Sequence, residues 1–249
     1  MIPQLRAEVA KFTSVRIGFI LIIATVGYVG LSTAAQVAFS DIPGLSGLQT
    51  ESAVRGVFAS AGAGLIFALV IGILGMTAEY RHQTITSTLL ITPKRERVVV
   101  AKTLAAVGLG FVVGLAAAVT SVGVGLIALT FRSHATIPVH SVLTTLAGVM
   151  AAYVCYAVLG TAIGTLITNQ VAAITGALLW VMLVEPLLGA FLPKVGRWLP
   201  GGAASGLAQA TGLRGTGYLA PAAAAAVLLG YTVMLAAIAT RTTLRRDIT

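Results

Sequence analysis

Long stretches without any Asp, Glu, Lys or Arg constrain this chain more than any other feature of its sequence. They cover residues 17–40, 56–78, 103–131, 133–184 and 215–240. A helix that crosses ~30 Å of hydrocarbon needs about 20 apolar residues. Each stretch is therefore long enough for one crossing, and the fourth for two, with Asn169 predicted to cap the second of them. The predicted spans lie near residues 17–39, 55–78, 103–130, 141–167, 171–191 and 219–240.

The composition supports a chain buried in lipid. Hydrophobic residues make up 57% and charged residues only 9%, whereas soluble domains carry about a quarter charged residues. This excludes an ordinary soluble enzyme, a disordered chain and a collagen-like fibre. Alternation over segments of about ten residues, typical of membrane β-barrels, is not seen. We expect an all-α, polytopic membrane protein with six helices in one transmembrane domain over residues 1–249, and a first span that is retained rather than cleaved as a signal peptide.

The distribution of basic residues predicts the orientation. Most of the sixteen Lys and Arg residues fall in segments that are cytoplasmic if both termini are inside, which is the side where such residues concentrate. The net charge of +9 is explained by attraction to anionic lipid at the inner face, because no aromatic and basic module for nucleic acid is present. We therefore expect membrane lipid as a partner and no nucleic acid.

The N-terminal segment 1–16 is predicted to form an amphipathic helix in the inner interface. Its apolar stripe consists of Ile2, Leu5, Val9 and Phe12. These residues share one face at helical spacing, and Lys11 lies on the other. The alternative is a simple extension of the first span.

A long inner loop, residues 79–102, contains a second amphipathic segment. Ile85, Leu89 and Leu90 are apolar at helical spacing, and Pro93 ends the segment. A short helix bounded by charge is suited to docking into a groove on a soluble partner. The alternative is a solvated loop that only fixes topology.

The outer connection, residues 193–218, is too long for a tight turn. Trp198 and Tyr218 are placed like interfacial anchors, and residues 201–210 can form a short re-entrant or surface helix after Pro200. This segment is either the outer cap of a pathway or a lid on the bundle.

Glu185 is the only formally charged side chain predicted inside a membrane crossing. An ionisable group there is a functional candidate by default, because burying its charge is costly. Pro186 follows it and should kink the helix or end its regular part. The alternative is that Glu185 reaches the outer interface.

The sequence has no pattern of a catalyst. It lacks H-E-x-x-H, paired Asp motifs and the G-x-x-x-x-G-K-[ST] phosphate loop. We therefore expect no enzyme, no metal site and no cofactor in this chain. Glycine pairs four residues apart, such as Gly110 with Gly114, Gly160 with Gly164 and Gly202 with Gly206, predict close helix packing within the chain.

These features together resemble the membrane-spanning permease subunit of type 2 ATP-binding-cassette (ABC) exporters, in particular small bacterial permeases of drug and antibiotic efflux. The resemblance covers nearly the whole chain and is sharpest in residues 79–102, with Glu185-Pro186 and Trp198-Leu199-Pro200 fitting the same family. Family members usually have Gly-Thr where this chain has Gln83-Thr84. By this resemblance, the coupling helix that contacts a separate ATPase involves Glu79, Tyr80, Arg81, Thr84, Ile85, Thr88, Leu89 and Leu90.

The resemblance implies a multidrug or antibiotic-resistance transporter in the bacterial cell membrane. Two permease copies, identical or related, would form the pathway with two soluble ATPases that hold ATP and Mg²⁺. Glu185 and Pro186 would lie near the outer end of that pathway. The substrate would be amphiphilic or apolar, since the spans offer few charges. Substrate identity, transport direction and homodimer against heterodimer stay open, and the rival classes are a secondary transporter or channel and an accessory membrane protein.

Overall fold

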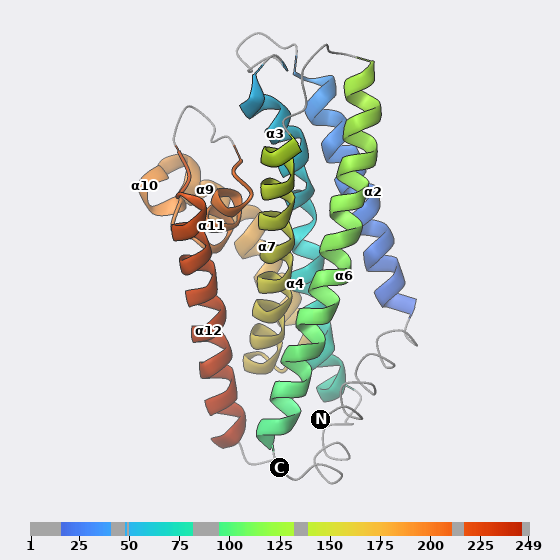
Figure 1. Cartoon of the computed structure of the whole chain (residues 1–249). Coiled ribbons are helices and arrows are strands. Elements are labelled where there is room, and N and C mark those ends of the chain that lie inside the picture. The colour runs from blue at the N-terminus through green and yellow to red at the C-terminus, as the bar shows by residue number, and fades with distance from the viewer. Residues whose placement is uncertain are drawn as a thin grey trace.

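A computed structural model describes residues 16–40, 48, 50–81, 95–131, 139–210 and 217–245. Within these ranges the chain is a bundle of helices without strands (Figure 1). Six helices are long and apolar enough to cross a membrane: Arg16–Ala38, Glu51–Ala78, Val100–Thr130, Val139–Leu166, Gln170–Phe191 and Pro221–Thr242. The prediction of an all-α, multi-pass membrane architecture with six spans is confirmed.

Two of the spans are interrupted by other helix types. The second consists of α3 (Glu51–Ala59), the 3₁₀ turn η1 (Ser60–Gly64) and α4 (Leu65–Arg81). The fifth consists of α8 (Gln170–Leu179), the π turn η2 (Trp180–Val184) and α9 (Glu185–Phe191). The other elements are α2 (Arg16–Ala38), α6 (Arg95–Thr130), α7 (Val139–Leu166), α10 (Pro193–Gly196), α11 (Pro200–Leu207) and α12 (Pro221–Arg245).

The fourth span, α7, is the centre of the bundle. It packs most extensively against α4, α6 and α12, and also contacts α3 and α11. Tyr153 and Tyr156 of α7 are almost fully buried and belong to the main core, as do Val29 of α2 and Leu228 of α12. The core is thus built around α7, and the first, fifth and sixth spans are the least buried of the six.

Glycines set the close approach of α7 to its neighbours. A Cβ on Gly160 would collide with the carbonyl of Leu69 in α4, and one on Gly72 of α4 would collide with the carbonyl of Ala157. On the other side, a Cβ at Gly110 of α6 would lie 2.9 Å from the Tyr153 carbonyl oxygen. Because small residues let helix backbones approach in lipid, the predicted glycine-mediated packing is confirmed at these positions.

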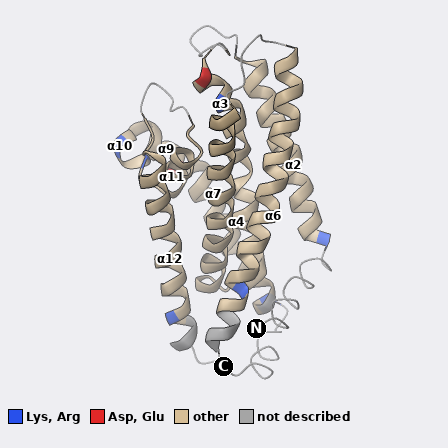
Figure 2. Cartoon of the chain, in the orientation of Figure 1, with Lys and Arg blue, Asp and Glu red and all other residues tan. Residues whose placement is uncertain are grey.

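The first and last described helices begin and end on the same side of the bundle. Arg16 starts α2 and Arg245 ends α12 at the lower end of Figure 1. We call this the terminal end and the other the opposite end. Charged residues of the described part are visible toward the two ends and not at mid-height (Figure 2). The cytoplasmic location of the terminal end stays a prediction.

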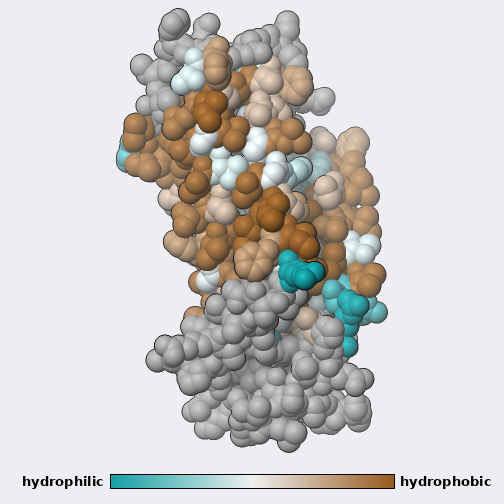
Figure 3. All heavy atoms as spheres, turned by 90° about the vertical axis from the view of Figure 1, so that its right-hand side faces the viewer, coloured by the Kyte–Doolittle hydropathy of each residue, from teal (hydrophilic) through white to brown (hydrophobic). Residues whose placement is uncertain are grey.

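The outer face of the bundle is apolar. Ile23 and Leu31 of α2 are each 69% exposed, and Val119 of α6 is 64% exposed. Figure 3 shows hydrophobic residues over much of the described surface on one side. Such a surface is expected where helices face lipid rather than water.

Candidate functional site

The fifth span leads into a short helical hairpin at the opposite end. Its first helix is capped by Asn169, whose Oδ1 accepts the N–H of Ala172 at 3.1 Å, so the predicted N-cap is confirmed. Beyond α9 the chain turns at Leu192 and returns through α10 and α11. The helix predicted after Pro200 is present as α11. We call residues 180–207 the hairpin.

Glu185 lies inside this hairpin and is 8% exposed. Its Oε1 accepts a hydrogen bond from Trp180 Nε1 at 2.7 Å, and its Oε2 accepts one from the backbone N–H of Gly201 at 2.7 Å. Gly201 is in the first turn of α11, where free N–H groups and the helix dipole favour a negative charge. The carboxylate therefore joins the start of α9 to the start of α11.

The π turn brings Trp180 and Glu185 to the same side of the helix. The backbone N–H of Glu185 donates to the carbonyl of Trp180, five residues earlier. Pro186 has no N–H to donate to Met182, so the α-helical bonding pattern cannot continue through this point. The irregularity expected around Pro186 is present, and it begins before the proline, at Trp180. Single π turns are common at functional sites.

Glycines allow the hairpin to close tightly. A Cβ on Gly201 would collide with the Glu185 carboxylate, and a Cβ on Gly196 would lie 2.6 Å from the Cα of Gly189. The same Cβ position on Gly201 is 3.7 Å from the hydroxyl of Tyr156. Tyr156 belongs to α7, so the carboxylate site lies against the central helix.

The hydrogen bonds of Glu185 stabilise the hairpin. Both carboxylate oxygens accept hydrogen bonds from the chain itself, which offsets the cost of burying the charge. Glu185 therefore positions the hairpin, and Pro186 fixes where the helix changes type. A role of either residue in a pathway remains a prediction.

A second polar cluster, which was not predicted from the sequence, surrounds the interruption of the second span. Thr33 of α2 lies with its Oγ1 2.8 Å from Ser60 Oγ and 3.4 Å from Ser121 Oγ of α6. Ser121 donates in turn to the carbonyl of Phe58 at 3.4 Å. Tyr153 of α7 donates to the carbonyl of Ala61 at 2.9 Å. Three neighbouring helices thus bond to one interrupted segment.

The residues around this interruption explain its position. Ser60 to Gly64 read Ser-Ala-Gly-Ala-Gly, a run of small residues inside a span. Glycine costs about 1 kcal/mol relative to alanine within a helix, and the poorer hydrogen-bond geometry of a 3₁₀ turn is supplemented here by an outside donor, the hydroxyl of Tyr153. This run was the available signal for a helix interruption.

The predicted coupling segment is described only at its start. Glu79, Tyr80 and Arg81 form the last turn of α4, at the terminal end. Arg81 Nη1 donates to Gln170 Oε1 at 3.5 Å, a contact that joins the end of α4 to the start of α8. The remaining predicted residues of this segment lie outside the described residues: Thr84, Ile85, Thr88, Leu89 and Leu90. The interfacial stripe also lies outside them: Ile2, Leu5, Val9 and Phe12.

Lys102 is a buried charged residue, although it was predicted to lie at the end of a loop. It lies in α6 and is only 4% exposed, and its Nζ donates to the carbonyl of Gly75 in α4 at 3.2 Å. Because α6 begins at Arg95, Lys102 is already two turns inside the helix. The view that Glu185 alone brings a charge into the bundle was therefore wrong.

No protein-family model matches this chain, and no curated protein matches it either. These two comparisons therefore do not support the family expected from the sequence.

Proposed function

We propose that this chain is the permease subunit of an ABC exporter of type 2, which forms a pathway for amphiphilic or apolar substrates and is driven by a separate ATPase subunit. The supporting observation is the arrangement of the two connections between spans. The helix α4 ends at the terminal end, where the predicted docking segment begins, and the hairpin held by Glu185 lies at the opposite end. A docking element on one side and a closing element on the other suit a transporter driven from one side of the membrane.

The mechanism follows from this arrangement. ATP binding on the partner subunits would draw two ATPases together and move the loops that follow α4. The contact between Arg81 and Gln170 would pass that movement to α8 and the fifth span. The central packing of α4 on α7 has no space for adjustment at Gly72 and Gly160, so α4 and α7 would move as one body.

The test is co-purification of an ATPase with the full chain from its native host. A variant with Ile85→Asp and Leu89→Asp should lose the ATPase, because the apolar face of the segment becomes charged. The matched control is Ser87→Asp, which adds a negative charge to the same loop on the side of the helix opposite to Ile85 and Leu89. Loss of the ATPase in both variants, or its absence from well-folded wild type, would contradict the proposal.

One observation favours a second candidate, a secondary transporter. The interrupted spans are the second and the fifth, which occupy the same place in each half of a chain of six spans. Paired interrupted helices in two halves are typical of secondary transporters. Substrate movement in vesicles that contain only this chain and an ion gradient would support this candidate, and a strict requirement for ATP would exclude it.

A further inference from the structure

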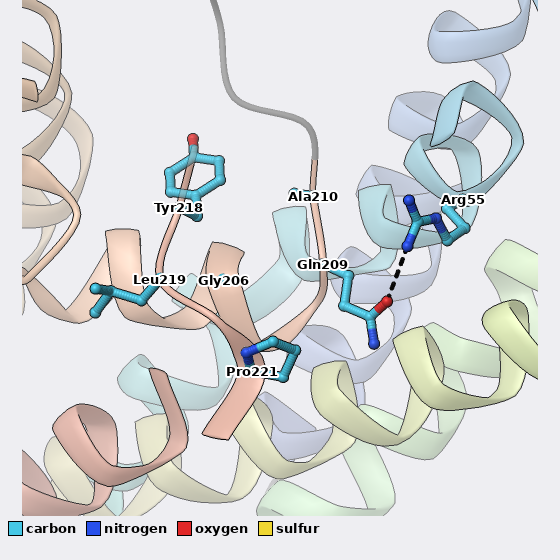
Figure 4. Close-up of a pocket in the computed structure, with 7 residues that line it drawn as sticks. All are labelled: Arg55, Gly206, Gln209, Ala210, Tyr218, Leu219 and Pro221. Atoms are coloured by element: carbon cyan, nitrogen blue, oxygen red, sulfur yellow. Dashed lines mark hydrogen bonds between the residues drawn. The ribbon is translucent and has the colours of Figure 1, made fainter. Parts of the chain in front are cut away.

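A pocket at the opposite end lies between α3 and the segment that leads into α12. It has a volume of about 310 Å³ and is lined by Arg55, Gly206, Gln209, Tyr218 and Pro221, among others. Figure 4 shows Arg55 and Gln209 on one side of the pocket and Tyr218 and Leu219 on the other. Its size is at the lower end of the ~300–1,000 Å³ range of small-molecule sites.

The guanidinium of Arg55 is only partly satisfied within the described chain. Its Nη1 donates to Gln209 Oε1 at 3.0 Å (Figure 4), and its Nε is shielded from solvent without a hydrogen-bond partner. Among the described residues no carboxylate pairs with it, and Glu51, one turn earlier on α3, accepts a hydrogen bond from Ser141 instead. A shielded donor of a charged group without a partner is costly and rare in proteins.

Gln209 is held in an unusual conformation beside this arginine. Its φ is 52°, the only positive φ among the described residues other than glycine. It follows the end of α11, where glycine is the usual residue because a Cβ is disfavoured. Since its Oε1 accepts from Arg55, its Nε2 keeps two N–H donors. The polar side of the pocket therefore consists of donors and a positive charge.

Donors in this arrangement are suited to an oxyanion. The fork of an arginine matches a phosphate with two parallel hydrogen bonds, and a planar guanidinium is favoured over lysine for this task. We propose that this pocket binds the phosphate group of an anionic phospholipid, with Arg55 as the principal ligand and Gln209 as the residue that orients it. The inference is independent of the transport function proposed above.

The position of the pocket favours a lipid as the source of the phosphate. Arg55 lies in the second turn of the span that starts at Glu51, and Pro221 is the first residue of the sixth span. The pocket is therefore at the level where two apolar helices end, which is the level of lipid headgroups. Below it, α12 exposes Leu229 and Val233 by 53% and 65%, an apolar surface that acyl chains can cover.

The experiment uses the purified full chain in a neutral detergent. Phosphatidylglycerol, diacylglycerol and inorganic phosphate are the three probes, and retention is measured by native mass spectrometry together with the shift in unfolding temperature. Wild type should retain phosphatidylglycerol and not diacylglycerol, which lacks the phosphate. Arg55→Gln should bind phosphatidylglycerol about tenfold more weakly, as expected for the loss of a charged hydrogen-bonding group.

Two further variants make the test specific. Arg197→Gln removes an exposed positive charge from the hairpin, outside the pocket and near Trp198, and should leave binding unchanged. Arg55→Lys keeps the positive charge but lacks the planar pair of guanidinium donors, so it should bind phosphatidylglycerol at an intermediate level. If Arg55→Gln does not fold, the comparison of Arg55→Lys with wild type serves as the test of the site. Equal binding by wild type and the Arg55 variants, or an equal loss in Arg197→Gln, would overturn the site. Displacement of the lipid by millimolar inorganic phosphate would retain a phosphate site and overturn the lipid as its source.

Discussion

The two interrupted spans are stabilised in different ways. The interruption in the second span lies in the centre of the bundle. In the most apolar part of that span, Glu51–Ala78, 67% of the residues are buried, whereas only 17% are buried in the corresponding part of the fifth span, Gln170–Phe191. Neutral hydroxyls from α2, α6 and α7 surround the first, namely those of Thr33, Ser121 and Tyr153. One carboxylate, Glu185, accepts the hydrogen bonds at the second.

The difference follows from the number of neighbours. A central segment has helices on several sides, so several weak hydrogen bonds and close packing can share the task. A peripheral segment has few neighbouring helices to stabilise it. There a single charged group with two short hydrogen bonds supplies the stabilisation, since hydrogen bonds to charged groups are about twice as strong as neutral ones. We therefore expect damage at the centre to be global, and damage at the hairpin to be local.

The largest effect is expected for Gly64→Ala, at the end of the central interruption. The new Cβ would collide with the Tyr153 hydroxyl and lie 3.0 Å from the side chains of Thr25 and Val29. Overpacking of this kind costs about 2 kcal/mol. Thermal unfolding in detergent should show a clearly lowered midpoint for the whole chain.

Gly62→Ala is the matched control within the same 3₁₀ turn. Its Cβ would meet only the Leu65 side chain, at 3.9 Å. Alanine there should leave the midpoint unchanged or raise it slightly, because it reduces the entropy of the unfolded chain. Equal destabilisation by both alanines would mean that the turn needs glycine for its backbone and not for its packing.

A smaller and more local effect is expected for Glu185→Gln. The amide can accept only one of the two hydrogen bonds and turns a donor toward the other N–H. A loss of about 1.5 kcal/mol follows from the value of hydrogen bonds to charged groups. Hydrogen exchange should accelerate at Gly201 and its neighbours in α11, while the amides of α4 and α7 keep their protection.

The control for this change is Glu51→Gln, the same substitution at an exposed glutamate whose partner is Ser141. It should leave exchange in α11 unaltered. Faster exchange across α4 and α7 in Glu185→Gln would contradict the local role of the hairpin.

The sequence was sufficient for those features that depend on local composition. Six spans, the N-cap at Asn169 and the helix that starts at Pro200 all follow from apolar length, capping chemistry and proline geometry. The irregularity around Pro186 was also predictable, since a proline removes a hydrogen bond wherever it stands within a helix.

Features that depend on contacts between distant segments could not be predicted in the same way. Lys102 was placed in a loop because it follows a run of charges, yet α4 and α6 bury it together. Arg55 stands at the edge of a span, and only folding brings Gln209 to it. The interruption at Ser60–Gly64 has a local signal in its small residues, but its hydroxyl partners come from three other helices.

The smallest effect is expected for Thr33→Val, which removes the hydroxyl shared by Ser60 and Ser121. Each serine keeps a backbone acceptor, Val57 for Ser60 and Phe58 for Ser121. No buried donor is then left without a partner, and the loss in the free energy of unfolding should stay below about 0.5 kcal/mol, less than a typical hydrogen bond.

Tyr153→Phe removes the only donor to the Ala61 carbonyl from another helix among the described contacts, so it should lower the free energy of unfolding by about 1 kcal/mol. The two hydroxyls share no partner, and the double variant should equal the sum of the single variants in thermal unfolding. A double variant much less stable than that sum would mean that the two hydroxyls depend on each other, and would contradict the view that several independent weak hydrogen bonds stabilise the central interruption.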